Sequence, residues 1–276
     1  KVDVLLTQFS FAAWKGGKEN KKWRREAAVE KLKTIDLQIK KFQPKFVIPF
    51  ASYVYFSNEE NFYLNDAANR PDQLKEKLKE YDSKLIIMSP NDVIGGIDQS
   101  LNEKKALKFW SHQYEEMIKK KLNQYSTIEP EALKCSFISY CERISKNNNL
   151  LLIKIIKTLS PINFFKPVII KLTDLDLCIK FDYVNKTLIK TFEPAMLSMK
   201  SESLDFIFKN SFGFDTLTVN GCFEEEQKGG FVKATKSLAI ENLNNLGIKI
   251  ELKTLLNFSV IKLFLTRLYR VAKKLA

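Results

Sequence analysis

The sequence predicts an α/β fold in its N-terminal part, followed by an α+β domain. Over residues 1–95, short apolar runs alternate with a helical pattern, which is typical of βαβ crossovers. Beyond residue 168, apolar runs follow one another across short turns, which is typical of antiparallel or mixed sheets. With 276 residues, 45% of them hydrophobic, the chain can form two cores. A helical break at Glu129-Pro130 suggests domains at residues 1–126 and 127–276.

The N-terminal part begins with a strand, a helix and a second strand. Residues 2–7 and 46–50 are apolar runs typical of parallel strands that are buried on both faces. Between them, apolar side chains recur every three or four positions over residues 23–42, and Pro44 ends the helix. Such a crossover is right-handed by strong preference, so the loops that follow the two strands meet at one sheet edge. We therefore expect the loop around Trp14 to lie beside the loop after the second strand.

The same periodicities predict the remaining elements. Before residue 168 we expect a helix at residues 71–81, a strand at 84–88 and a helical region at 102–145 that breaks at Glu129-Pro130. In the C-terminal part we expect strands at residues 168–172, 175–183, 187–192 and 215–221, with a hairpin turn at 184–186. We expect further helices at residues 201–208, where Ser201 is the predicted N-cap, and at 234–245 and 255–272.

The composition excludes several classes of function. The net charge is +13, but no binding motif organises the basic residues, so we expect a solvated basic surface and no nucleic-acid site. An anionic small molecule or a lipid-like ligand remains compatible with that charge. The four cysteines lack CxxC spacing and the density of a disulfide framework, which favours a cytoplasmic location. Two lysines and Pro161 interrupt the apolar residues 150–165, so we expect no transmembrane segment.

One loop holds most candidate binding residues. Residues 51–66 mix hydrogen-bonding, acidic and aromatic side chains beside a buried strand, and such loops commonly contact ligands. The alternative is that the aromatic rings anchor the core while the acids face water. The candidate ligand-binding residues are Trp14, Ser52, Tyr53, Asn58, Glu59, Asn61 and Asp66. With a single histidine and no catalytic motif, the chain has no assigned catalytic residue, and we expect it to bind no metal or other cofactor alone.

Three stretches carry a family resemblance: VDVLLTQFSFAAWKGG, WRREAAVEKLKTIDLQIKKFQPK and VIPFASYVYFSNEENFYLNDAANRPDQL. They resemble the C-terminal half of metallo-β-lactamase-fold hydrolases, most closely the branch that includes the hydroxylase acting on CMP-N-acetylneuraminate. The resemblance implies that residues 1–126 are half of an αββα sandwich. It also implies a divalent metal (zinc, iron or manganese) for the complete fold, bound mainly by an HxHxDH motif that this chain lacks. Ala51 stands where many relatives carry a metal-binding histidine.

The C-terminal part carries a second resemblance. Residues 168–245 are similar to sterol-carrier-like domains appended to some of these enzymes, which implies an apolar ligand between sheet and helices. Because the chain starts without Met and reaches strand-like sequence by Val2, we expect an upstream segment. The implied partner is the missing N-terminal half of the fold or a self-associating copy. The chain would then form one active-site wall of a metal-dependent hydrolase-like protein, inactive alone, plus an accessory domain. The alternative is a non-catalytic binding module for an anionic or amphipathic ligand.

Overall fold

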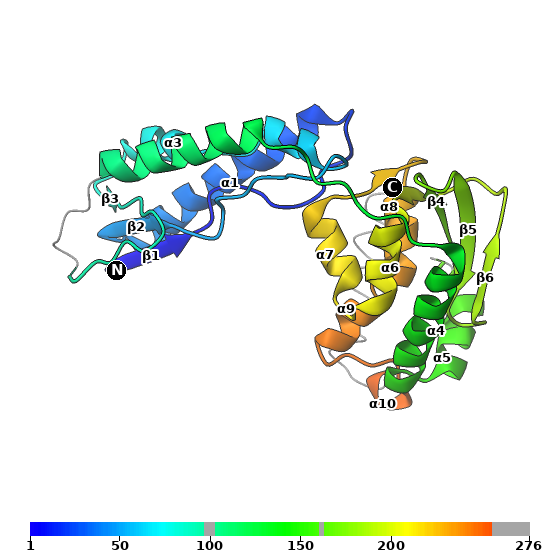
Figure 1. The fold of residues 1–276 in the computed structure, drawn as a ribbon. Helices are drawn as coiled ribbons and strands as arrows, with labels where there is room; N and C mark the ends of the chain where they lie inside the picture. Colours follow the sequence, from blue (N-terminus) through cyan, green and yellow to red (C-terminus); the bar gives the residue numbers. More distant parts are fainter. Residues whose placement is uncertain (97–102, 160–162, 256–276) are drawn as a thin grey trace. The chain divides into compact units, whose positions relative to one another are not determined.

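The computed structural model describes residues 1–96, 103–159 and 163–255, which form two compact units (Figure 1). The first unit comprises residues 1–124 and 218–222, and the second begins at residue 125. Residues 218–222 therefore belong to a unit from which they are distant in sequence. The predicted α/β class is confirmed, because both units combine helices with a sheet.

The first unit is built on a three-stranded parallel sheet. Its strands pair in the order β1 (Val4–Thr7), β2 (Phe46–Pro49) and β3 (Lys84–Leu85). The register aligns Leu5, Val47 and Leu85 in one row, which faces a buried apolar cluster. The helices of this unit are α1 (Lys21–Phe42), η1 (Phe62–Asp66), α2 (Pro71–Leu78) and α3 (Glu103–Lys119). These elements agree with the predicted strands and helices, although the third strand is shorter than residues 84–88.

The crossover helix α1 forms for local reasons. The side-chain oxygen of Asn20 accepts a hydrogen bond from Trp23 N and caps the helix. Ile35 and Ile39, one turn apart, are buried in the cluster that faces the sheet. The helix ends where Gln43 adopts a left-handed conformation (φ 46°), immediately before a proline.

The second unit has a mixed sheet with helices packed against it. Its strands are β4 (Val168–Leu172), β5 (Leu177–Asp182), β6 (Thr187–Lys190), β7 (Leu197–Met199) and β8 (Glu224–Glu225). They lie in the order β6-β5-β4-β7-β8, with only the β4–β7 pair parallel among the described strands. The helices are α4 (Pro130–Asn147), α5 (Leu150–Leu159), α6 (Ser201–Lys209), α7 (Gly213–Asn220), α8 (Gly230–Leu238), α9 (Ile240–Asn245) and α10 (Leu252–Leu255). The last turn of α7 falls within the first unit.

Aromatic side chains form the centre of this second unit. Phe208 of α6 is fully buried and lies 5.2 Å, ring centre to ring centre, from Phe181 of β5. The rings of Phe137 and Tyr140 on α4 lie 5.3 Å from the same phenylalanine. The predicted β5–β6 hairpin is confirmed, and Asp182 closes its turn by accepting the backbone N–H of Val184.

Three predicted features of the C-terminal part are wrong. Residues 215–220 form helix rather than strand, because Phe214 and Leu217, three apart, both bury their side chains. Ser201 is the first helical residue instead of the N-cap. The carboxylate of Asp174 accepts its N–H and O–H, so a distant side chain satisfies this helix end. Finally, the helix expected at 234–245 is two helices, α8 and α9.

Two expectations about the chain's later segments have different outcomes. The helix expected at residues 255–272 lies, except for its first residue, outside the described residues. None of the helices in the described ranges combines the length and the hydropathy that a bilayer span requires.

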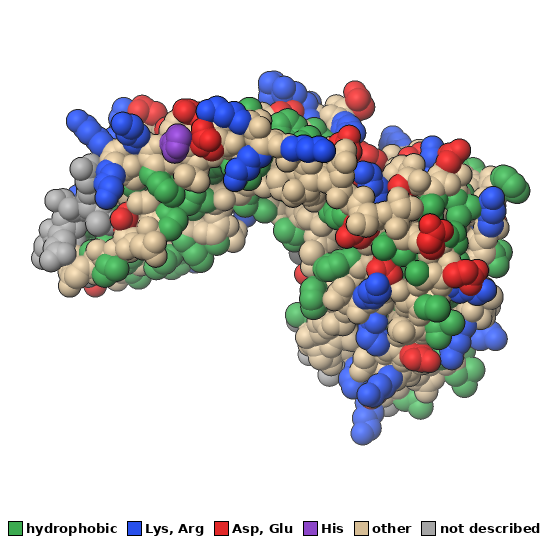
Figure 2. All heavy atoms as spheres, in the orientation of Figure 1, with side chains coloured by type: hydrophobic (Ala, Val, Ile, Leu, Met, Phe, Trp, Pro, Cys, Tyr) green, Lys and Arg blue, Asp and Glu red, His purple; other side chains and the backbone are tan. Residues whose placement is uncertain are grey.

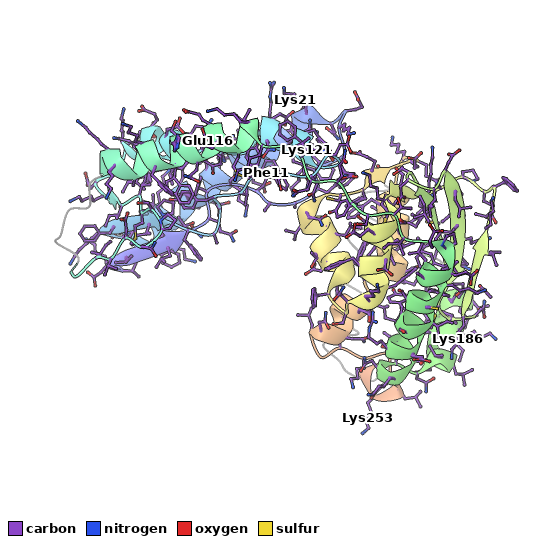
Figure 3. All side chains as sticks on the ribbon, in the orientation of Figure 1. Phe11, Lys21, Glu116, Lys121, Lys186 and Lys253 are labelled. Carbon is purple, nitrogen blue, oxygen red and sulfur yellow. The ribbon has the colours of Figure 1, made fainter. Side chains whose placement is uncertain are left out.

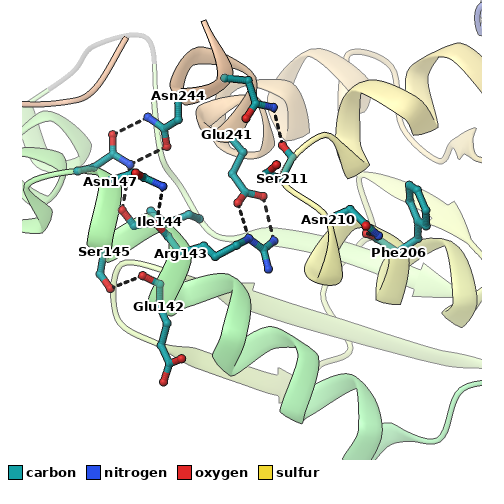
Figure 4. A network of polar contacts seen from close by, with 12 residues as sticks. Glu142, Arg143, Ile144, Ser145, Asn147, Phe206, Asn210, Ser211, Glu241 and Asn244 are labelled. Atoms are coloured by element: carbon teal, nitrogen blue, oxygen red, sulfur yellow. Dashed lines mark hydrogen bonds and ion pairs between the residues drawn. The ribbon is translucent and has the colours of Figure 1, made fainter. Parts of the chain in front are cut away.

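A polar network ties α4 to α9 in the second unit (Figure 4). Arg143 donates to both carboxylate oxygens of Glu241, at 2.9 and 3.3 Å. The amides of Asn148 and Asn244 exchange hydrogen bonds at 2.9 and 3.0 Å. Burial raises the pKa of Glu241, and the neighbouring guanidinium opposes that shift. Because each of these side chains has a partner from the facing element, we assign the network to stability.

Candidate functional site

The loops that follow β1 and β2 meet at the carboxyl edge of the first unit's sheet. Phe50 N donates to Thr7 O at 3.0 Å, and Phe9 N donates to Ser52 Oγ at 3.1 Å. The expectation that these two loops are neighbours is confirmed. Parallel strands joined by one crossover helix end at the same edge of the sheet, so the loops that follow them both begin at that edge.

A cavity of about 610 Å³ lies at this edge. Its walls come from the loop after β1, from one face of α1, and from single residues after β2 and in the returning segment 218–222. The lining residues are Gln8, Ser10, Phe11, Ala12, Ala13, Lys15, Ala27, Glu30, Lys31, Thr34, Ala51 and Val219. This volume falls within the range of about 300–1,000 Å³ that small-molecule sites occupy. The four alanines leave the space that larger side chains would fill.

The charged side chains of the cavity are Lys15, Glu30 and Lys31. Lys31 Nζ donates to the side-chain oxygen of Gln8 at 3.3 Å, which links α1 to the loop after β1. The ammonium group of Lys15 lies 5.9 Å from the centre of the Trp23 ring, a cation–π distance. Two cations and one carboxylate give the cavity a net positive charge.

Phe11, labelled in Figure 3, is the aromatic residue among those that line the cavity. Its ring is buried against Ala27 and Ala28 of α1. This packing therefore holds the loop after β1 against the helix that carries Lys31.

Ala51, which also lines the cavity, has a left-handed backbone with φ 51°. For a residue with a side chain this conformation costs roughly 1–2 kcal/mol. The strain arises where β2 stops and its loop turns toward the cavity, and backbone strain of this kind is concentrated at functional sites. The side chain here is a methyl group, so it offers no atom that can bind a metal.

A smaller cavity of about 280 Å³ is lined by two of the predicted residues, Asn58 and Asn61. The amide of Asn61 donates to Asn220 O at 2.8 Å and accepts from Asn58 N at 3.0 Å. The amide of Asn58 in turn donates to Cys222 Sγ at 3.3 Å. Both asparagines thus hold residues 218–222 against the loop after β2, which is a structural use of their polar atoms.

Three further predicted residues are packed into the first unit. Ser52 is buried and accepts the loop contact described above. The ring of Tyr53 stacks on Trp110 at 3.9 Å, and burial raises the pKa of its phenol. Trp14 is buried edge-on to the Trp23 ring at 5.8 Å, and its backbone N–H donates to Thr218 O. None of these three lines the larger cavity.

The two predicted acids also lie outside both cavities. Asp66 forms a two-point ion pair with Arg24, with both N–O distances at 2.9 Å. Hydrogen bonding from that guanidinium lowers the pKa of Asp66. Glu59 is exposed, and its backbone N–H donates to Asn123 O. A ligand-binding role for the seven predicted residues stays a prediction.

Sequence reasoning missed the side chains that line the larger cavity. Lys15 directly follows the predicted Trp14, and one face of α1 carries Ala27, Lys31 and Thr34 at spacings of four and three. Because the crossover rule places the start of α1 near the carboxyl edge, this spacing could have indicated that these side chains line a site there.

Across the part of the chain that the structure describes, no three His, Cys, Asp or Glu side chains are grouped closely enough to hold a metal ion. The expectation that this chain alone binds no metal stays a prediction.

The comparisons with known proteins assign no family. No family model, curated protein or solved structure matches this chain. Its function must be argued from the geometry of the two units.

Proposed function

We propose that the first unit is one half of a two-layer, metallo-β-lactamase-like hydrolase fold, and that its carboxyl edge forms one wall of an active site. The outer face of the sheet carries the proposal. Strand alternation places Val4, Leu6, Phe46 and Ile48 on the face opposite the buried row. All four are apolar, yet they are half-buried or exposed, and Leu6 is 55% exposed. Figure 2 shows hydrophobic side chains gathered along the strand side of this unit.

A parallel sheet with apolar side chains on both faces is normally covered on both faces. Here α1 and α2 cover one face, through Ile35, Ile39, Leu74 and Leu78. A second sheet packed on the outer face, about 10 Å away, would complete an αββα arrangement. The occupant we propose is therefore the N-terminal half of the same fold.

In this arrangement the chain supplies binding groups and the other half supplies the reactive centre. A divalent metal in the complete fold would provide Lewis-acid chemistry, but the described side chains of this chain contribute no set of ligands for it. The chain alone would be inactive, and the second unit would serve as an accessory domain. A sterol-carrier-like cavity in that unit and a cytoplasmic location stay predictions.

Self-association of the isolated chain tests the uncovered face. We expect sedimentation velocity to show concentration-dependent oligomers, which Leu6→Lys together with Ile48→Lys reduces. Leu37→Lys is the matched control, because Leu37 is 69% exposed on α1, away from the outer face. A wild-type chain that stays monomeric at all concentrations, or a control that dissociates oligomers equally, contradicts the proposal.

Restoring the other half tests the enzyme itself. We expect the coding region upstream of Lys1 to encode a strand-rich segment with an HxHxDH motif. The joined protein would bind metal stoichiometrically in elemental analysis, whereas residues 1–276 would bind none. An upstream region without metal-binding residues would favour the alternative, a non-catalytic binding module that needs only this chain.

A further inference from the structure

We propose that the 610 Å³ cavity at the carboxyl edge binds an anionic sugar-sized molecule, with Lys15 and Lys31 as the groups that hold its phosphate or carboxylate. The volume is well beyond that of an inorganic anion and suits a hexose phosphate or a sugar acid. The site uses only residues of the first unit. The proposed binding therefore does not depend on whether a second layer covers the sheet.

The charges of the cavity favour an anion. Within the described residues, neither Lys15 nor Lys31 forms an ion pair. Further along the same helix, Asp36 does neutralise a lysine, since its carboxylate lies 3.2 Å from Lys77 Nζ. Two half-buried ammonium groups that share one concave surface raise the local concentration of anions more than scattered surface lysines do.

Polar neutral groups complete the site for the body of a sugar. Ser10 Oγ accepts the N–H of Asn69 at 2.9 Å, which leaves the hydroxyl hydrogen to donate to a ligand. Thr34 Oγ1 donates to Glu30 O at 2.9 Å, so its lone pairs can accept from a sugar hydroxyl. The Glu30 carboxylate also accepts from hydroxyls, and it would repel a second anionic group. One anionic group with several hydroxyls is the ligand chemistry that this arrangement matches.

Calorimetric titration of the full chain tests the site with defined probes. We expect saturable one-to-one binding of glucose 6-phosphate, weaker binding of inorganic phosphate, and none of glucose at matched ionic strength. Gluconate tests the carboxylate source: its binding at the same site would support the shared anionic-sugar chemistry. If gluconate alone bound, phosphate recognition would be overturned.

Charge-neutralising variants separate the cavity from the general basic surface. Lys15→Gln and Lys31→Gln should each weaken glucose 6-phosphate about tenfold, the loss typical of one charged hydrogen bond. Lys33→Gln is the matched control, because Lys33 is exposed on α1 and does not line the cavity. It should change affinity less than twofold. Circular dichroism would confirm that every variant folds.

Two outcomes would overturn the proposal. One is no saturable binding of either anionic sugar by the folded wild-type chain. The other is equal weakening by all three lysine variants, which would assign binding to the net positive charge. Neither outcome depends on self-association, so failure here is distinguishable from failure of the proposed function.

Discussion

Replacing Arg24 with methionine removes one side of an ion pair that organises the first unit. The Arg24 side chain is only 2% exposed and contacts both carboxylate oxygens of Asp66 at 2.9 Å. It also donates to the backbone carbonyls of Gly17 and Lys18, and it lies 4.9 Å from the centre of the Tyr63 ring. One guanidinium thus joins the loop before α1 to η1.

The cost follows from the burial of the two partners. Removing one member of a buried ion pair typically destabilises a protein by about 3–5 kcal/mol, because the other charge is left unpaired. The Asp66 side chain is 25% exposed, so water can partly hydrate the carboxylate that remains. We therefore expect Arg24→Met to lower the free energy of unfolding of this unit by about 3 kcal/mol at pH 7, the lower end of that range.

The same pair predicts a pH dependence. The pKa of Asp66 is lowered from its ordinary value of 3.8, chiefly by the hydrogen bond from Arg24. The stabilisation is therefore fully present above this ordinary, unfolded-state pKa and is lost as the pH falls through the lower, folded-state pKa. The destabilisation caused by Arg24→Met should be largest near neutral pH and should shrink as the pH falls through the lowered, folded-state pKa of Asp66.

Tryptophan fluorescence can report this unit alone, since all three tryptophans, Trp14, Trp23 and Trp110, lie within residues 1–124. Urea unfolding followed by fluorescence at pH 7 and at pH 3 measures both parts of the prediction. Arg25→Met is the control, because Arg25 is exposed and should change stability by less than about 0.5 kcal/mol. An Arg24→Met loss under 1 kcal/mol at pH 7, or equal to the control, would refute the reasoning.

Three further predictions concern the second unit. Gly230→Ala should strongly destabilise it in thermal unfolding, because a Cβ at that position would lie 2.2 Å from a backbone carbonyl oxygen. Gly229→Ala is the control, because a Cβ there meets no atom within 4 Å. Its left-handed backbone (φ 79°) should cost only about 1 kcal/mol. Phe208→Ala should cost about 3–5 kcal/mol by far-ultraviolet circular dichroism, and a loss below 1 kcal/mol would contradict its central place in the core. Burial raises the pKa of the Cys141 thiol to about 12, so iodoacetamide at pH 8 should label exposed Cys135 first; equal labelling rates in the folded chain would be inconsistent with this burial.

Local patterns predicted the crossover and most elements well. The helix α1 repeats apolar residues at its own period and stops before Pro44, so its extent depends mainly on neighbours in sequence. The run DTLTV within residues 215–221 was assigned to a strand because its β-branched residues favour strands. It forms α7 because burying Phe214 and Leu217 on one side outweighs that weak local preference.

The candidate site was only partly predictable. The carboxyl edge and the meeting of its two loops followed from the parallel pairing of two strands joined by a single crossover. Asp66 was a reasonable ligand candidate by composition, yet it is paired with Arg24, 42 residues away in sequence. The sequence does not distinguish Lys15 and Lys31 from the other lysines. They differ from the others because both line one cavity, which only the tertiary structure shows.

By itself, the sequence determined most of the elements, the parallel crossover and the excess of positive charge, because each depends mainly on composition or on contacts within a few residues. Only the tertiary structure decided which side chains share a cavity, and that residues 218–222 return to the first unit. It also showed that one apolar face of β1 and β2 is left partly exposed, although both faces read alike in the sequence. The physical reason is that burial depends on packing between residues that are distant along the chain, and local periodicity does not encode that packing.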